Sequence, residues 1–251
     1  MANDAKEVSV ANLLITGGSR GLGHGFSLGV PNQGDTVWLV SRGRPPSLDK
    51  ADGVTRRWIE ADLALPEASA KLAVALAGQP LDLLLYNAGI WEHNAFSSHY
   101  DFANVDLLET QQIINVNLVS MLACVQVLLP NLRQAAAGKI VLIGSTSGLE
   151  NNRQPEVAYN ASKFGVRGLA QALRQSLRQE NITVTCINPG SICAGASAPA
   201  DELGREAVLS RYGNALLPMH DLVALVRCVL QLSTATNVAE IDVPAMGDEQ
   251  A

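Results

Sequence analysis

The chain has few of the features that mark a disulfide scaffold, a metal centre or a nucleic-acid binder. Its four cysteines are spread over 251 residues without a C-x-x-C pair or a metal-ligand spacing. The net charge is −6 at pH 7, and no run of Lys and Arg provides the basic surface that a polyanion would need. We therefore expect no nucleic-acid partner, no metal site, and buried thiols that stay reduced.

Long hydrophobic runs are also scarce. Residues 1–12 are charged, and the apolar runs elsewhere stay short of the ~18 residues that a transmembrane helix needs. We expect a cytoplasmic protein with no membrane partner. Because the chain is 47% hydrophobic over 251 residues, it can bury one sizeable core, and a single domain over residues 1–251 is predicted.

One polar stretch carries residues suited to acid-base chemistry. Tyr159 and Lys163 are four positions apart, so on a helix they share a face. A phenol titrates near pH ~10 and is a weak catalyst at neutral pH unless a cation stabilises the phenolate. At about 4 Å and an effective dielectric of ~20, one cation contributes about 4 kcal/mol, which would bring the pKa of the phenol close to neutral pH. Ser145 follows an apolar run, and its hydroxyl can hydrogen-bond a carbonyl oxygen.

Further motifs stand at matching places along the chain. Residues 16–23 contain T-G-x-x-x-G-x-G after a short apolar run, residues 87–89 are Asn-Ala-Gly, and residues 188–190 are Asn-Pro-Gly. Each motif alone is also found in ordinary turns or helix surfaces. Together with Asn117, in this order, they resemble the short-chain dehydrogenase/reductase family in its Tyr-dependent form, over residues 11–190.

The resemblance implies four catalytic residues. Ser145 would hold the carbonyl oxygen, Tyr159 would exchange the proton, and Lys163 would lower the pKa of Tyr159 and bind the nicotinamide ribose. Asn117 would help to hold a water that links the lysine to solvent. An asparagine bonded to backbone is the structural alternative for Asn117, and both roles are compatible.

The resemblance also implies a dinucleotide held along the carboxyl ends of the strands. Glycines let the backbone approach a pyrophosphate at a helix N-terminus. Asp62 has an alternative role as the cap of a helix that begins near Pro66. The predicted cofactor residues are Gly17, Ser19, Arg20, Gly21, Leu22, Gly23, Ser41, Arg42, Asp62, Leu63, Asn87, Ala88, Gly89, Tyr159, Lys163, Pro189, Gly190 and Ile192.

The end of the second expected strand favours NADP(H). NAD-binding members usually place a carboxylate there for the ribose hydroxyls, and this chain has Ser41 instead. Arg42 and Arg20 can bind a 2′-phosphate from two sides, because a guanidinium grips phosphate in a fork. Both arginines are equally typical of a solvated surface.

The predicted fold is α/β: a single doubly wound Rossmann-type parallel sheet of about seven strands, with helices on both faces. Strands are expected at residues 13–15, 36–40, 57–60, 81–86, 139–143, 183–187 and 241–243. Residues 102–132 are apolar almost all round. A helix of this kind must bury more than the face that packs on its own sheet, and a partner subunit can cover the rest, so a homodimer or homotetramer is predicted. Residues 191–218 are expected to form a mobile substrate lid with a short helix at 201–210, followed by a helix at 222–232.

The function predicted is NADPH-dependent reduction of a ketone or aldehyde to an alcohol, a reversible hydride transfer with Tyr159 as general acid and base. An NAD-dependent alcohol or sugar dehydrogenase is the alternative, and a cofactor-sensing protein without turnover is a third. Residues 91–93, Trp-Glu-His, fall where the family begins its substrate cleft or on plain surface. Ala194 replaces a threonine that the family uses at the nicotinamide. The sequence leaves the substrate open.

Overall fold

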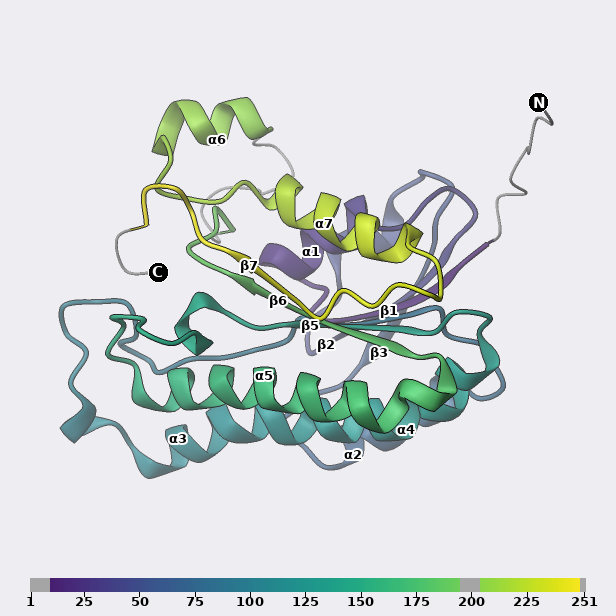
Figure 1. Ribbon diagram of the computed structural model, residues 1–251, viewed down its shortest axis with the longest axis horizontal. Helices are drawn as coiled ribbons and strands as arrows, with labels where there is room; N and C mark the ends of the chain where they lie inside the picture. Colours follow the sequence, from purple (N-terminus) through teal and green to yellow (C-terminus); the bar gives the residue numbers. More distant parts are fainter. Residues whose placement is uncertain (1–9, 195–203, 249–251) are drawn as a thin grey trace.

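Seven parallel strands form one sheet through the middle of the molecule (Figure 1). The computed structural model describes residues 10–194 and 204–248. The strands lie in the order β3-β2-β1-β4-β5-β6-β7, and every neighbouring pair is parallel. Their bounds are β1 Asn12–Thr16, β2 Thr36–Ser41, β3 Thr55–Glu60, β4 Leu83–Tyr86, β5 Lys139–Ile143, β6 Thr183–Pro189 and β7 Glu240–Val243. The predicted doubly wound α/β fold is confirmed.

Helices cover both faces of the sheet. In Figure 1, α2, α3, α4 and α5 lie below it, and α1, α6 and α7 lie above it. The two apolar clusters of the core follow this division, because alternate residues of each strand point to opposite faces. The helix bounds are α1 Gly21–Gly29, α2 Glu67–Ala75, α3 Leu107–Ile114, α4 Ser120–Gln134, α5 Val157–Leu177, α6 Arg205–Tyr212 and α7 Met219–Gln231.

The site is positioned where the neighbouring strands β1 and β4 lie side by side in the sheet. Strand order runs one way from β1 through β2 to β3 and the other way from β4 to β7. The loops after β1 and β4 therefore diverge at the carboxyl edge of the sheet, and in open α/β sheets this switch point is where ligands bind. The predicted glycine-rich turn and the Asn-Ala-Gly segment are these two loops.

The helix expected at residues 102–132 begins later, at Leu107, because Phe102–Asn104 is a separate 3-10 turn and Asp106 caps α3. From Leu107 to Gln134 it is one helical segment with a π turn, Asn115–Val119, between α3 and α4. By length and composition the segment Leu107–Gln134 could cross a membrane, so the expectation that every apolar run is too short for this was wrong. A core helix passes the same test, and the inner side of α4 packs on the sheet through Cys124, Leu128 and Leu132. On the outer side of the segment, Val119 at the end of the π turn and Leu122 on α4 are exposed.

Two details at the C-terminal side differ from expectation. The helix expected at 201–210 is α6, Arg205–Tyr212, and the last helix begins at Met219. Cys228 is exposed on α7, whereas Cys124, Cys186 and Cys193 are buried, so the expectation of buried thiols was wrong for Cys228. The centre of the expected lid, residues 195–203, lies outside the described residues.

Candidate active site

Ser145 and the helix α5 meet just beyond the carboxyl end of β5. Ser145 accepts a hydrogen bond from Ser147 N at 3.1 Å, which starts a short 3-10 turn, Thr146–Gly148. This turn lies directly on α5, since a Cβ added at Gly148 would come within 2.7 Å of the backbone of Lys163. The close approach places the Ser145 hydroxyl beside Tyr159 on the same helix.

Tyr159 lies in the first turn of α5, with its phenol close enough to Ser145 for this hydroxyl to affect the pKa of the phenol. Burial raises the pKa of the Tyr159 phenol to about 12, the Ser145 hydroxyl lowers it, and the carboxylates Glu156 and Glu92 raise it. The expectation that one lysine brings the pKa of Tyr159 close to neutrality was therefore wrong. That estimate counted the cation alone and left out the desolvation of the phenolate and the two carboxylates.

Lys163 is buried, with its Nζ 5.5 Å from the centre of the Tyr159 ring. Burial lowers the pKa of the Lys163 ammonium to about 8. The ammonium donates to the carbonyl of Ile143 at 3.0 Å. A buried ammonium with one backbone acceptor has further donors to offer to a ligand.

Asn117 stands in the π turn, an irregularity that is frequent at functional sites. Its amide nitrogen donates to Ile90 O at 2.9 Å, and its oxygen accepts from Ile90 N at 2.9 Å. A Cβ added at Gly89 would lie 3.5 Å from Asn117 Oδ1 and 3.6 Å from Lys163 Nζ, so both polar groups face the same glycine. The structural role of Asn117, holding the loop after β4, is therefore present together with its proximity to the lysine.

The glycine-rich turn packs closely against the Asn-Ala-Gly segment. Gly17 has a φ of +70°, and a Cβ on Gly23 would lie 2.1 Å from Gly17 O. Thr16 Oγ1 accepts from the amides of Asn87 and Ala88, both at 3.0 Å, and this pair of bonds joins the ends of β1 and β4. Ser19, Gly21 and Leu22 follow in the partly exposed stretch between β1 and the body of α1.

The two arginines expected at a 2′-phosphate, Arg20 and Arg42, are exposed and form no ion pair within the described part of the chain. Arg20 lies at the start of α1 and Arg42 just after β2. By contrast, Arg44 is paired with Asp49 at 2.8 Å. Ser41 is buried and donates to Gly43 O at 2.7 Å, which shapes the turn after β2.

The remaining predicted residues lie along the same edge of the sheet. Asp62 accepts from Ala64 N at 3.0 Å, so it caps the turn before α2 and not the helix itself, whose first flanking residue is Pro66. Leu63 is buried in the core. Pro189 ends β6, Gly190 N donates to Val243 O, and Ile192 pairs with Leu217.

Two buried carboxylates lie beside Tyr159. Glu92 belongs to the segment 91–93 that the sequence left open between substrate cleft and plain surface, and Glu156 was not recognised from the sequence. Glu92 Oε1 accepts from Ala158 N at 2.9 Å and from Tyr159 N at 3.3 Å, and Glu156 Oε1 accepts from Phe96 N at 2.7 Å. The position of Glu156 directly before α5 is a signal for a residue at a helix start. No local sequence signal indicates that Glu92 is buried beside α5, because its hydrogen-bond partners are 66 and 67 positions away.

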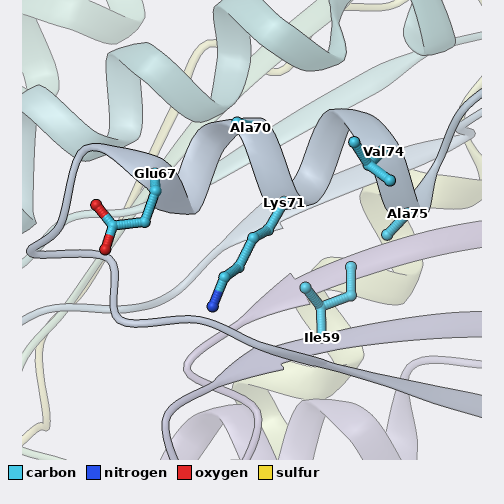
Figure 2. A pocket seen from close by; sticks show the side chains of 6 residues that line it. All are labelled: Ile59, Glu67, Ala70, Lys71, Val74 and Ala75. Carbon is cyan, nitrogen blue, oxygen red and sulfur yellow. The ribbon is translucent and has the colours of Figure 1, made fainter.

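A groove elsewhere on the surface is separate from this site. Figure 2 shows its lining from α2 and the edge strand β3, with Lys71 and Ile59 toward the hollow. The groove measures about 460 Å³, apolar residues line it together with Glu67 and Lys71, and none of the predicted site residues contributes to it. We therefore place the candidate site at the switch point and not in this groove.

A doubly wound sheet with Ser145, Tyr159 and Lys163 at its carboxyl edge has the arrangement of a dinucleotide-dependent oxidoreductase. A family model described as short chain dehydrogenase matches residues 11–202. The chain belongs to the short-chain dehydrogenase family of oxidoreductases.

Curated relatives include enzymes of two kinds. The chain is 31% identical over 218 residues to a 3-oxoacyl-(acyl-carrier-protein) reductase of Aggregatibacter actinomycetemcomitans, covering 80% of this chain and 86% of the relative. It is 32% identical over 195 residues to D-xylose 1-dehydrogenase of Caulobacter vibrioides, covering 72% of this chain and 71% of the relative.

Solved structures share the fold over most of the chain. A short chain dehydrogenase from Escherichia coli CFT073 complexed with NADPH has a TM-score of 0.75 and 25% identity, covering 94% of this chain and 96% of that one. A 3-oxoacyl-(acyl-carrier-protein) reductase from Brucella melitensis in complex with NAD has a TM-score of 0.77 and 22% identity, covering 94% and 96%.

Proposed function

We propose that the protein reduces a ketone or aldehyde to an alcohol with NADPH. The observation that carries the proposal is the meeting of Ser145, Tyr159 and Lys163 beside the glycine-rich turn. The residues present fit a dinucleotide. At the glycine-rich turn, only a glycine fits at position 23, because a Cβ there would collide with Gly17 O. At the same carboxyl edge of the sheet, the Lys163 ammonium faces Gly89.

The cofactor supplies the hydride when it is bound. Ser145 holds the carbonyl oxygen by a hydrogen bond, and the Tyr159 phenol gives its proton to that oxygen as negative charge develops there. The Lys163 cation stabilises the phenolate that remains, and Asn117 supports a water through which the proton is restored from solvent. Because the pKa of Tyr159 is about 12 before the cofactor binds, the phenol is fully protonated at neutral pH, as a proton donor must be.

The preference for NADPH rests on Arg20 and Arg42. Both guanidinium groups are exposed at the strand ends where the adenosine ribose lies in this fold. The solved relatives are complexed with NADPH in one case and NAD in another, so cofactor choice depends on these local residues. An NAD-dependent sugar or alcohol dehydrogenase is the second candidate, favoured by the similarity to D-xylose 1-dehydrogenase. A sensing protein without turnover is the third.

We also propose a homodimer built on α4 and α5, which could pair again into a tetramer. Val119 at the end of the π turn, Leu122 on α4, and Val157 and Phe164 on α5 are exposed apolar residues, and a symmetric partner would cover them. Light scattering at micromolar concentration should give at least twice the 26.5 kDa chain mass, and a monomer mass would contradict the dimer.

The remaining assignments also belong to the proposal. Residues 1–251 act as one cofactor-binding domain in the cytoplasm on a small carbonyl or alcohol compound, with neither nucleic acid nor membrane as partner. Residues 191–218 act as the lid. The described ends of the lid are tied together, since Cys193 N donates to Leu217 O at 3.0 Å and Leu217 N to Ser191 O at 2.8 Å.

The test is a cofactor titration by fluorescence followed by a carbonyl screen. NADPH absorbance should fall on addition of a reducible ketone or aldehyde at neutral pH, and kcat/KM with NADPH should exceed that with NADH. Oxidation of a sugar or alcohol with NAD alone would favour the second candidate. Cofactor binding without turnover on any carbonyl or alcohol would favour the sensor.

A further inference from the structure

Two large aromatic residues stand beside Tyr159 on the loop after β4. Trp91 and Phe96 are 54% and 52% exposed, although the chain holds few aromatic residues in total. Their rings contact the Tyr159 ring edge to face, with centroids 6.3 Å and 5.5 Å from it, and they contact each other at 5.8 Å. A half-exposed aromatic pair against the reacting phenol offers an apolar surface to whatever approaches Tyr159.

Buried carboxylates hold this aromatic pair in place. Phe96 has a φ of 60°, in the left-handed region, and its N–H donates to Glu156 Oε1 at 2.7 Å. A bulky residue rarely adopts this conformation unless the surroundings impose it, and such strain gathers at functional sites. Glu92, directly after Trp91, is held by the amides of Ala158 and Tyr159. The loop and the catalytic helix are thus joined at both ends of the aromatic segment.

The carboxylates also place negative charge behind the aromatic pair. Glu92 and Glu156 are each 1% exposed, and no donor among the described residues reaches the Oε2 atom of either. Their field reaches the reacting centre, because both carboxylates raise the pKa of Tyr159. Lys163 is the cation next to Tyr159 on its own helix, and the phenol of Tyr100, which accepts from Val157 N, is the further titratable group packed here.

We propose that residues 91–96 form the substrate-selecting wall, which accepts uncharged or cationic aromatic and alkyl carbonyl compounds and rejects compounds with an anionic group on the part of the molecule that contacts the aromatic pair. Trp91 and Phe96 supply the apolar contact. Glu92 and Glu156 supply the repulsion, which is strong because buried charges are screened little by water. This inference rests on the proposed carbonyl reduction.

Three ketones of one shape test the charge selection. They are 4-acetylbenzoate, its methyl ester and the 4-trimethylammonio analogue of acetophenone, assayed by NADPH oxidation. We expect kcat/KM for the ester and the cation to exceed that for the carboxylate by at least about tenfold. Equal or better use of the carboxylate by the wild type would overturn the proposal.

Charge-removing variants assign the effect to the carboxylates. Glu92→Gln keeps an oxygen for the amides at the start of α5 and should reduce the ester-to-carboxylate ratio at least about threefold, as should Glu156→Gln. Glu109→Gln is the matched control, because Glu109 binds the neighbouring His93 amide but is more exposed, and it should leave the ratio unchanged. Equal ratios in wild type, E92Q and E156Q would contradict the role of the buried charges.

Aromatic truncations test the apolar contact. Trp91→Ala should lower kcat/KM for the methyl ester about tenfold and leave propanal, which is too small to span the wall, within about threefold. Phe102→Ala is the control, since Phe102 is 61% exposed and makes no ring contact with Tyr159. Equal losses for both substrates would show a general loss of structure and overturn the selecting role.

The two levels of the proposal fail differently. If no carbonyl is reduced, the proposed function fails, and the wall is then tested by thermal shift of the NADP-loaded protein with the same three ketones. Stabilisation by the ester and the cation, but not by the carboxylate, would support the wall in that case. Stabilisation by the carboxylate alone, or by none of the three, would overturn it.

Discussion

The half of the site that would hold the cofactor and the half that would hold the substrate are built by different contacts. Around Gly17 and Gly23, backbone lies on backbone, and Thr16 joins two adjacent strands. Around Tyr159, the carboxylates of Glu156 and Glu92 accept hydrogen bonds from backbone amides 60 and 67 positions away. Small residues fix the first half, and buried charge and aromatic rings fix the second. In our proposal the cofactor half therefore depends on short motifs, whereas substrate selection depends on side chains whose partners are distant in sequence.

The largest expected effect lies where the two halves meet. Tyr159→Phe removes the proton donor and should lower turnover by about 10² to 10⁴, the range for general acid catalysis. Cofactor binding, measured by fluorescence titration, should stay nearly unchanged because the ring remains. Comparable turnover in the variant would end the proposed mechanism.

Gly23→Ala tests the backbone contact of the cofactor half. The added Cβ would lie 2.1 Å from Gly17 O and 2.7 Å from Asn87 Nδ2, so the turn must shift. Overpacking of this kind costs about 1–3 kcal/mol, which we expect as weaker cofactor binding in the same titration. Gly43→Ala is the matched control, since no atom lies within 4 Å of a Cβ there. Equal effects at both positions would contradict the role of this close backbone contact in cofactor binding.

A charge reversal sharpens the comparison within the cofactor half. The wild type should prefer NADPH over NADH at least about tenfold in kcat/KM, or about 1.4 kcal/mol, and Ser41→Asp with Arg42→Asp should erode that ratio. Arg44→Gln should not, because Arg44 is already paired with Asp49. A wild-type preference for NADH would refute the assignment of Arg20 and Arg42.

Raising the pH should lower the affinity for the cofactor, because Lys163 loses its positive charge. Burial lowers the pKa of this ammonium to about 8, so the cation is present at pH 7 and is lost as the pH rises through 8. If only the cation binds the ribose, affinity should fall about tenfold between pH 7 and pH 9. Lys163→Met should bind weakly at both pH values, and a wild-type affinity that is flat over this range would exclude the lysine from cofactor binding.

The smallest expected effect concerns Ala194, which stands where the family has a threonine. Its carbonyl lies 3.3 Å from a Cβ added at Gly21, so this segment reaches the glycine-rich turn. Ala194→Thr should add one hydrogen bond, about 0.5 to 1.5 kcal/mol, and tighten NADPH without changing which carbonyls are accepted. Weaker binding would mean that the alanine makes room in the pocket.

Local sequence signals were sufficient for the sheet and for the positions of the glycine-rich turn and the Asn-Ala-Gly segment after β1 and β4. Apolar runs and glycine turns predicted all seven strands, with ends shifted by a few residues, because those features act over short distances. The buried Glu92 and Glu156 could not be assigned, since their partners are set by the packing of α5 against the loop after β4. For the same reason the pKa of Tyr159 was placed too low.

The most direct test of the central claim follows the hydride itself. Wild-type protein is incubated with NADPH that carries deuterium at the transferred position and with the methyl ester ketone, and the product is analysed by mass spectrometry and NMR. Our account predicts deuterium on the carbinol carbon of the alcohol, with at least about 10²-fold less product from Tyr159→Phe. Bound cofactor with no deuterated alcohol, or equal product from the variant, would contradict carbonyl reduction at this site.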